Sequence, residues 1–113
     1  MTQMRTIDIA HPPLSSKIAG EALDELLREI RLSKNVRVLK IIHGHGSSRS
    51  GGSLKNFVLD WAHTNKNRIR AVIEGDHYHV FDKKTQEMRK ECGQTVDADL
   101  GASNHGMTIL WIK

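Results

Sequence analysis

The chain has 113 residues, of which 38% are hydrophobic and 27% charged, and its formal net charge is +4 at pH 7. This length is enough for one domain that buries a core without metal or disulfide crosslinks. No apolar run approaches the roughly 18 residues that a membrane span needs, and the first eight residues lack the apolar segment of a secretory signal. The single cysteine, Cys92, cannot form an internal disulfide. These features predict a cytoplasmic domain with no membrane partner and an inert thiol.

Basic residues are concentrated in the middle of the chain. Residues 31–70 contain nine Lys or Arg and one acidic residue, Asp60, so this stretch carries +8 and the rest of the chain carries −4. The nine are Arg31, Lys34, Arg37, Lys40, Arg49, Lys55, Lys66, Arg68 and Arg70. Such asymmetry is typical of a surface that binds a polyanion, because cations that neutralise phosphates release counterions. A solvated basic face on an ordinary protein is the alternative, and charge alone does not choose between them.

The first third of the chain predicts a strand followed by a helix. Residues 6–10 are rich in β-branched side chains and are followed by two prolines, which lack amide donors and force the chain out of a sheet. Residues 14–32 place apolar side chains at helical spacing and offer Ser15 or Ser16 as the N-cap. Gly20 falls inside this helix, and close packing against a strand is the expected reason for it.

The next segments continue the alternation of strands and helices. Residues 36–42 end in a fully apolar run, which is typical of a central strand covered on both faces. Apolar side chains at helical spacing over residues 54–61 predict a second helix with Ser53 as its cap. Residues 69–73 and 107–112 predict the third and the last strand.

The segment between the third and the last strand fits this pattern least well. Residues 77–81 could be a strand, and residues 83–92 could be a short helix with Asp82 as N-cap and Gly93 at its end. Residues 97–105 are predicted to be a loop. The whole pattern indicates an α/β fold, a two-layer β-α-β-α-β-(insert)-β sandwich with a mixed, mostly parallel sheet. Its final strand is a candidate for an antiparallel edge strand.

Residues 41–55, IIHGHGSSRSGGSLK, are the most informative stretch, since they join a buried strand to the start of a helix. Ligands of open α/β sheets bind at that edge. Glycines let the backbone approach an anion closely, and the amides and dipole of a first helical turn favour negative charge. The spacing matches neither a P-loop nor the GxGxxG pattern. The expected ligand is a nucleic-acid phosphate, and the residues expected to bind it are Gly44, Gly46, Arg49, Gly52, Ser53 and Lys55.

Several side chains near this loop could carry protons. His43 and His45 can give or take a proton near neutral pH, as phosphodiester cleavage requires; alternatively, His43 only bonds a loop carbonyl and His45 is solvated. Asp8, a carboxylate in an apolar strand, must be paired, functional or placed at the open end of the strand. His11 points to the other face of the strand unless the chain turns before it, in which case it can join the site.

A second group of histidines raises the question of a metal. His77 and His79 would share one face of a strand, a spacing that binds metal when further ligands converge. His105, Asp97 and Asp99 are near them only in the sequence. The group matches no zinc spacing, so no metal site is predicted.

Three motifs, in this order along the chain, resemble those of the small MutS-related (Smr) domain family. The opening motif, Leu-Asp-Leu-His-Gly, resembles residues 7–10, with Ala10 where the histidine is expected. The central motif is His-Gly-x-Gly followed by Gly-x-Leu-Arg/Lys, and residues 43–46 and 52–55 match it closely. The closing motif, Gly-x-Thr before a hydrophobic strand, is matched by residues 106–110.

The resemblance implies one Smr-like domain over residues 1–113, with an enlarged segment at about residues 74–105. It also implies binding to DNA or RNA, since some relatives nick DNA and others cleave RNA, several of them at ribosomes. We therefore expect an endonuclease in which Asp8 orients or activates a catalytic group, His43 is the general acid or base, and His11 replaces the absent histidine.

The cofactor depends on the substrate. RNA can supply its own 2′-hydroxyl as nucleophile and needs no metal in principle, whereas DNA requires water and favours a divalent cation such as magnesium on Asp8. Two alternatives to the nuclease remain. One is a non-catalytic module that binds DNA, RNA or a ribosome through the same loop, and the other is an enzyme acting on a small phosphate compound.

Overall fold

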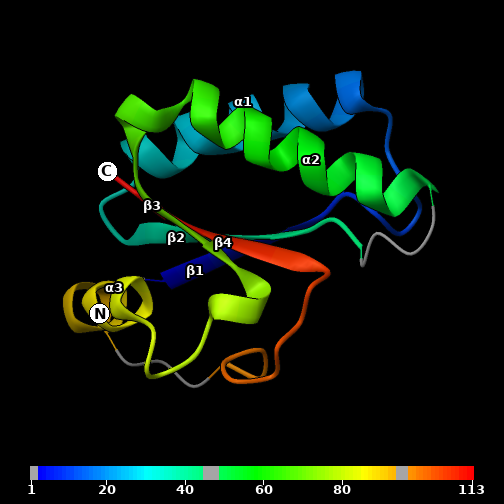
Figure 1. Cartoon of the computed structure of the whole chain (residues 1–113). Coiled ribbons are helices and arrows are strands. Elements are labelled where there is room, and N and C mark those ends of the chain that lie inside the picture. Colours follow the sequence, from blue (N-terminus) through cyan, green and yellow to red (C-terminus); the bar gives the residue numbers. More distant parts are fainter. Residues whose placement is uncertain (1–2, 45–48, 94–96) are drawn as a thin grey trace.

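The computed structural model describes residues 3–44, 49–93 and 97–113, which form one four-stranded sheet with helices on both faces (Figure 1). In chain order the elements are β1 (Gln3–Asp8), α1 (Ser16–Leu32), β2 (Val36–Ile42), α2 (Arg49–Thr64), the 3-10 helix η1 (Lys66–Arg68), β3 (Ile69–Glu74), the 3-10 helix η2 (Gly75–His77), α3 (Lys83–Cys92) and β4 (Met107–Ile112). This order confirms the predicted α/β class with a mixed sheet.

The α1 helix forms where the apolar spacing predicts it. The Ser15 hydroxyl caps it by accepting a hydrogen bond from the Ile18 amide at 3.2 Å. Gly20, however, faces α2 and not a strand, because a Cβ atom there would lie 3.1 Å from the ring of Phe57. The missing side chain therefore allows the two helices to approach each other.

The α2 helix begins earlier than predicted. Its first residue is Arg49, so Ser53 lies inside the helix and is not its N-cap. The prediction rested on apolar side chains, which begin only at Leu54, and on the low helix propensity of Gly51 and Gly52. Both glycines nevertheless lie within the helix.

The order of the strands in the sheet is β1-β2-β4-β3. β1 and β2 pair in parallel, whereas β4 is antiparallel to β2 on one side and to β3 on the other. β1, β2 and β3 therefore all run in one direction. The antiparallel direction of the last strand is confirmed, but its edge position is wrong. All six residues of β4 are buried, as expected of a strand with a neighbour on each side and cover on both faces.

Two apolar cores lie on the two faces of the sheet. α1 and α2 cover one face, where Leu23, Leu27 and Val58 pack on Leu39 and Leu110. The residues that follow β3 cover the opposite face, and the core there comprises Val38, Ile73, Tyr78, Met88, Cys92, Met107, Ile109 and Trp111. The β-α-β-α-β part is thus two-layered as predicted, and α3 with its flanking loops adds cover on the second face (Figure 1).

The predicted caps of α3 are confirmed. The Asp82 carboxylate accepts the Thr85 amide at 2.9 Å, and Gly93 follows the helix with a φ of 100°, which favours glycine. Residues 77–81 do not form the expected strand, since η2 and a turn occupy this position and direct Tyr78 into the core. Among the described residues, no helix is long and apolar enough to cross a membrane.

Candidate functional site

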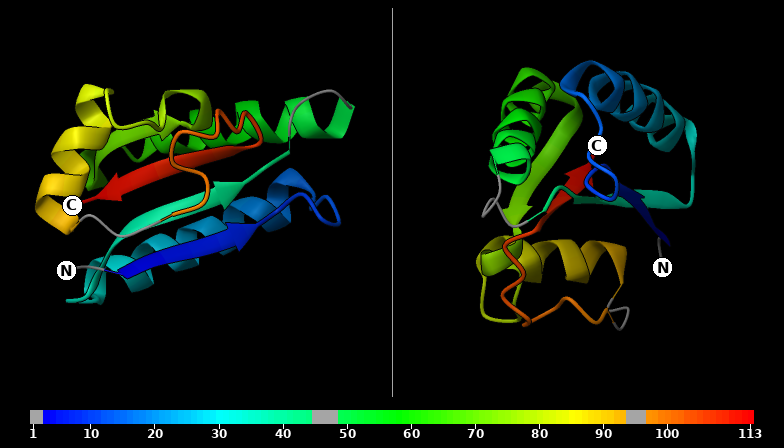
Figure 2. Two further views of the ribbon diagram at one scale, coloured as in Figure 1. Left: turned by 90° about the horizontal axis from the view of Figure 1, so that it is seen from below. Right: turned by 90° about the vertical axis from the view of Figure 1, so that its right-hand side faces the viewer.

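The candidate site lies where β1, β2 and β3 end and β4 begins, an edge that we call the carboxyl edge (Figure 2). Asp8, the last residue of β1, is the register partner of Ile42, the last residue of β2, and Ile42 is in turn the partner of Met107 in β4. Glu74, at the end of β3, pairs with Thr108. The expected site residues that the structure describes at this edge therefore come from neighbouring strands and from the start of α2.

Asp8 and His11 form an exposed pair at this edge. The chain turns directly after β1, and the Leu14 amide donates to the Ile9 carbonyl at 2.9 Å, so His11 folds back onto Asp8. The Nδ1 atom of His11 lies 2.9 Å from Oδ2 of Asp8, and the amides of Ala10 and His11 donate to Oδ1 of the same carboxylate. The His11 side chain is 68% exposed. The turn that the sequence required for His11 to join the site is present.

The contacts of Asp8 keep it ionised. Burial acts to raise the pKa of Asp8, but hydrogen bonds from the Ala10 amide and from His11, together with the charge of the imidazole, hold this pKa below its usual value. A carboxylate that accepts the Nδ1 proton fixes the tautomer of the ring and leaves Nε2 of His11 as the atom that can exchange a proton with a ligand.

His43 has the opposite environment, because its side chain is fully buried. Nδ1 lies 3.0 Å from the Gly44 carbonyl and Nε2 lies 2.9 Å from the Thr108 hydroxyl. A carbonyl can only accept, so Nδ1 carries a proton, and Nε2 forms its hydrogen bond with the Thr108 hydroxyl. Of the two interpretations that the sequence left open for His43, the structure shows the hydrogen bond to a loop carbonyl.

Asp8 and His43 approach the carboxyl edge from opposite faces of the sheet. Asp8 shares the α3 face of β1 with Met4, whereas Thr108 shares the α1–α2 face of β4 with Leu110, and His43 reaches that face through Thr108. Asp8 is therefore placed to orient His11, not His43.

The loop between β2 and α2 lies partly outside the described residues. Gly44 has a φ of 88°, which a residue with a side chain rarely adopts. His45 and Gly46, two expected site residues, lie outside the described part of the chain. The backbone of Arg49, Gly52 and Ser53 belongs to the first turns of α2, whose positive dipole end lies at this edge, and their side chains are likewise outside the description. The expected binding of phosphate by these residues stays a prediction.

Lys55 is the expected phosphate-binding cation that the structure describes. Its Nζ atom lies 3.4 Å from Oε1 of Glu74 at the end of β3, and a quarter of its side chain is exposed. Glu74 thus neutralises part of this charge.

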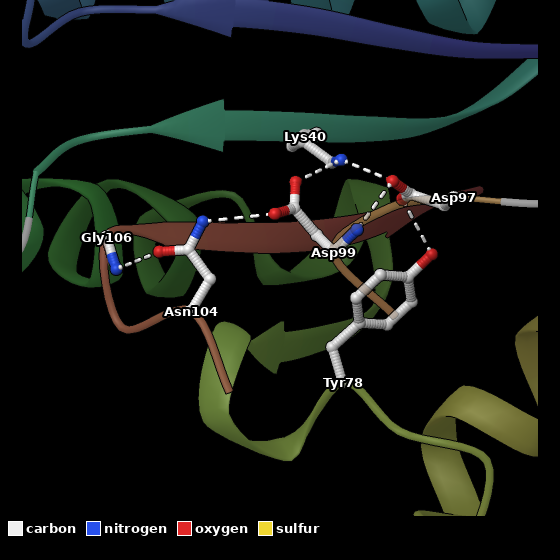
Figure 3. A network of polar contacts seen from close by, with 6 residues as sticks. All are labelled: Lys40, Tyr78, Asp97, Asp99, Asn104 and Gly106. Carbon is white, nitrogen blue, oxygen red and sulfur yellow. Dashed lines mark hydrogen bonds and ion pairs between the residues drawn. The ribbon is translucent and has the colours of Figure 1, made fainter. Parts of the chain in front are cut away.

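Lys40 is not part of a basic surface, although its charge was counted in the basic stretch. Its side chain is 9% exposed, and Nζ lies 2.8 Å from Oδ1 of Asp97 and 2.6 Å from Oδ2 of Asp99 (Figure 3). The Tyr78 hydroxyl donates to the other oxygen of Asp97 at 2.9 Å. The sequence could not indicate this pairing, because both carboxylates lie in a loop far along the chain and no local pattern connects them with a residue of β2.

This buried cluster shifts the pKa of each group that it contains. Burial acts to lower the pKa of Lys40, but its two carboxylate partners raise it above the usual value. For Asp97, burial acts to raise the pKa, but the contacts with Lys40, the Asp99 amide and the Tyr78 hydroxyl together lower it below its usual value. For Asp99 the bond to Lys40 is the largest cause of a lowered pKa. Burial and the bond to Asp97 raise the pKa of Tyr78 well above its usual range.

The cluster is connected to His43 through the loop before β4. Asn104 donates from its side chain to Asp99 at 3.1 Å and accepts the Gly106 amide at 2.9 Å (Figure 3). The Gly106 carbonyl then accepts the amides of His43 and Gly44 at 2.9 and 3.0 Å. A close approach of η2 supports the same loop, because a Cβ on Gly75 would lie only 1.7 Å from the Asn104 carbonyl oxygen.

Two histidines that the sequence did not assign to the site also lie at the carboxyl edge. His77 Nε2 lies 3.8 Å from Oδ2 of Asp76, and His105 Nδ1 lies 3.9 Å from the same oxygen. The expectation that His77 and His79 share a strand face is wrong, because no strand forms there. No group of three or more His, Cys, Asp or Glu side chains within the described residues is arranged to hold a metal ion.

The sequence model of the Smr domain family matches residues 13–83, which is more than half of the chain. The chain belongs to the Smr domain family. A solved structure, the Smr domain of MutS2 from Thermus thermophilus, resembles this Smr domain with a TM-score of 0.58 and 17% sequence identity over 96% of this chain and 98% of that one. No curated protein sequence matches the chain significantly.

The family match covers part of what the sequence motifs indicated for this Smr domain. It includes the central motif at residues 43–46 and 52–55, but it begins after Asp8 and His11 and ends before Thr108. The structure joins these outer segments to the centre, because Thr108 bonds to His43 and Ile9 donates to the Ile42 carbonyl at 2.9 Å. The residues of the opening and closing motifs therefore lie next to those of the central motif in the folded chain.

Proposed function

We propose that this Smr domain binds nucleic acid at the carboxyl edge and cleaves a phosphodiester there, with His11 as the group that transfers the proton. The observation that carries the proposal is the exposed Asp8–His11 pair, whose nitrogen and oxygen lie 2.9 Å apart. The pair lies at the end of β1, beside the glycine-containing loop. The opening motif of the family has a histidine at the position of Ala10, one residue before His11. Asp8 is a positioning residue in this scheme.

His11 has the chemistry that cleavage needs. Its exposed Nε2 can take a proton from an attacking hydroxyl or give one to the leaving oxygen, which is typically worth about 10²–10⁴-fold in rate. The backbone of Gly44 and Gly46, the start of α2 and Lys55 would hold the phosphate. His43, being buried, acts as a positioning residue that fixes the path of the chain from β2 into this loop.

The test compares His11→Ala with His63→Ala, since His63 is exposed on α2 and lies far from the carboxyl edge. Labelled single- and double-stranded DNA and RNA are incubated with each purified protein, and binding is measured in parallel. We expect His11→Ala to lower the rate at least 100-fold with binding retained, and His63→Ala to leave both unchanged. Equal rates for all three proteins would overturn the role of His11.

The ends of the products identify the substrate chemistry. A cyclic phosphate that forms in the presence of EDTA indicates RNA cleaved by its own 2′-hydroxyl. Loss of DNA cleavage in EDTA, restored by magnesium, indicates attack by water with a divalent cation, for which Asp8 is the nearest expected ligand.

The second candidate function is a non-catalytic module that binds DNA, RNA or a ribosome through the same loop. The burial of His43 favours it, because the histidine of the central motif has both ring nitrogens engaged within the protein. This function predicts salt-sensitive binding without cleavage of any of the four substrates. If the cleaving activity is lost as the protein is purified further while binding is retained, this second candidate is favoured.

A further inference from the structure

Most of the basic stretch lies at the end of the molecule opposite the carboxyl edge. α1 and α2 run antiparallel to β1, β2 and β3, so the turns that follow both helices meet at the ends where these strands begin (Figure 2). Ile69 pairs with Ile112 there, and the Lys113 amide donates to the Arg68 carbonyl at 3.0 Å. The exposed cations that meet at this end, which we call the basic end, are Arg31, Lys34, Lys66, Arg68 and Arg70.

The cations of the basic end differ from other cations of the chain in their ion pairing. Within the part of the chain that the structure describes, none of its five cations forms an ion pair with a carboxylate. Arg28, Lys40 and Lys55, by contrast, each have a carboxylate partner. A cluster of unpaired cations on one side of a small domain produces a positive potential that attracts polyanions.

A groove of about 300 Å³ crosses this end between α1 and the turn after α2. Arg31 and Arg68 line it from the two sides, together with Arg28, Leu27, Asn65 and Asp24. The Asp24 carboxylate in this groove is engaged, since it accepts the indole N–H of Trp61 at 2.8 Å. The groove therefore offers guanidinium groups on both walls, a geometry that suits the oxygens of a phosphate.

Arg70 lies at the same end of the molecule, against Trp111 of the core on the α3 face. Its guanidinium carbon lies 5.3 Å from the centre of the Trp111 ring, a cation–π contact that holds the side chain in place. Beside it lies a second groove of about 150 Å³, lined by three cations, Arg37, Arg70 and Lys113, and by one carboxylate, Glu91. Stacking on the indole leaves the N–H edge of the guanidinium available to a phosphate oxygen.

We propose that the basic end is a second nucleic-acid contact, which binds the sugar–phosphate backbone of the strand that reaches the carboxyl edge. The proposal deepens the proposed function and rests on it. The seven residues of β2 separate the two ends by about 23 Å at the usual rise of a strand. A ligand must therefore be long enough to contact both ends, whereas a mononucleotide or a very short oligonucleotide contacts only one.

The test neutralises the groove with Arg31→Gln/Arg68→Gln and measures RNA affinity by fluorescence anisotropy over a series of salt concentrations. Arg31→Lys/Arg68→Lys keeps the charge at the same positions, and Lys83→Gln/Lys84→Gln removes the same charge from the exposed start of α3. We expect the Gln pair at the groove to weaken binding of a 20-nucleotide RNA at least tenfold. The slope of log affinity against log salt should fall by about 0.7 for each phosphate that the variant no longer neutralises.

The controls and ligand length decide the outcome. The α3 pair should bind within about twofold of the parent chain, and the Lys pair should bind more tightly than the Gln pair because it keeps the charge. A four-nucleotide RNA should lose less affinity to the Gln pair than the long RNA does, because it can still bind at the carboxyl edge alone. Equal affinity of the Gln pair and the parent for the long RNA would overturn the proposal and leave an acidic protein surface as the partner to examine. Thermal melts of each variant establish that it is folded.

Failure of this proposal and failure of the proposed function give different results. If the Gln pair binds like the parent while His11→Ala abolishes cleavage, the proposal for the basic end is wrong and the proposed function stands. If the Gln pair loses affinity while His11→Ala cleaves at the parent rate, the proposal for the basic end stands and the role proposed for His11 is wrong. A parent chain that binds no nucleic acid at all overturns both.

Discussion

Histidines of one chain can differ in function because their surroundings differ. His11 and His43 lie near the same edge of the sheet, but the first presents a ring nitrogen to solvent and the second has both ring nitrogens bound inside the protein. A buried imidazole with two satisfied hydrogen bonds fixes the local backbone at little cost, whereas burial without partners is expensive. The Thr108 hydroxyl therefore belongs to the structural requirements of His43.

Thr108→Val tests this at the level of one hydrogen bond. Valine has nearly the same shape, so the change leaves Nε2 of His43 buried without its hydroxyl partner and should lower the free energy of unfolding by about 1–3 kcal/mol. Thr64→Val is the matched control, because the Thr64 hydroxyl bonds to the Asp60 carbonyl at an exposed helix end and should matter by less than about 0.5 kcal/mol. Both values come from urea unfolding, and equal losses would contradict the structural role of Thr108.

At the scale of elements, the loop before β4 is held by two ion pairs to Lys40 and by Leu100, which packs against the core on the α3 face. Its residues offer Asp97 and Asp99 to Lys40, and few of its side chains are apolar. A single buried cation therefore attaches an irregular segment to the middle of the sheet. Through Asn104 and Gly106, this attachment also supports the backbone of His43 and Gly44.

Lys40→Met removes the cation but keeps a chain of similar length. Two carboxylates are then left partly buried with no counter-charge, which typically costs about 3–5 kcal/mol when a buried pair is broken. We expect the free energy of unfolding at pH 7 to fall by that amount. A companion variant, Lys40→Met with Asp97→Asn and Asp99→Asn, should recover part of the loss, since no unpaired charge remains.

The same cluster gives stability a definite pH dependence. The pKa values of Asp97 and Asp99 are lowered in the folded chain, so their stabilisation is complete above about pH 4 and is lost as the pH falls through the folded values. The pKa of Lys40 is raised, so its stabilisation is complete below about pH 10.4 and is lost as the pH rises through the folded value. Urea unfolding across the pH range should show both losses in the parent chain, and the triple variant should show a smaller acid loss.

The sequence predicts the local features of the fold better than the contacts between distant segments. The bounds of β2, α3 and β4 and the capping of α1 by Ser15 follow from apolar spacing and cap residues, which act over a few positions. The start of α2 is not predicted, because Gly51 and Gly52 have a low helix propensity. The central position of β4 depends on its pairing with β2, whose partners are more than 60 residues apart, and periodicity carries no information about such a pairing.

In the candidate site, too, contacts between near residues could be predicted and contacts between distant residues could not. Asp8 and His11 are three residues apart, so a turn after β1 could be expected to join them, and it does. The partners of Lys40 and of His43 lie 57 and 65 residues away, and only the folded chain brings them together. Charge counting over residues 31–70 also assumed that neighbours in the sequence are neighbours in space.

At the scale of the whole molecule, that assumption fails because each helix carries the chain from one end of the sheet to the other. Positive residues at the helix ends and at the strand starts collect at the basic end, while Asp8, His11 and the glycine-containing loop lie at the carboxyl edge. The domain is therefore electrostatically polar along its strands. Such a distribution favours a long polyanion lying along the protein over a compact one.

The position of β4 determines when the sheet can form during synthesis. β3 pairs only with β4 among the described strands, and β4 also supplies the second neighbour of β2, so residues 107–112 close the sheet from its middle. Without residues 107–112 the pairing of β1 with β2 is still possible, but β3 has no partner among the described strands. Folding must then wait for the final strand, as expected when essential contacts are distant in sequence.

A fragment of residues 1–106 tests this order. We expect it to lack the cooperative unfolding transition of the full chain and to regain part of it when a peptide of residues 107–113 is added in excess. Far-ultraviolet circular dichroism during thermal unfolding measures both. A fragment that unfolds as sharply as the full chain would mean that the helices and the β1–β2 pair form a stable unit without β4.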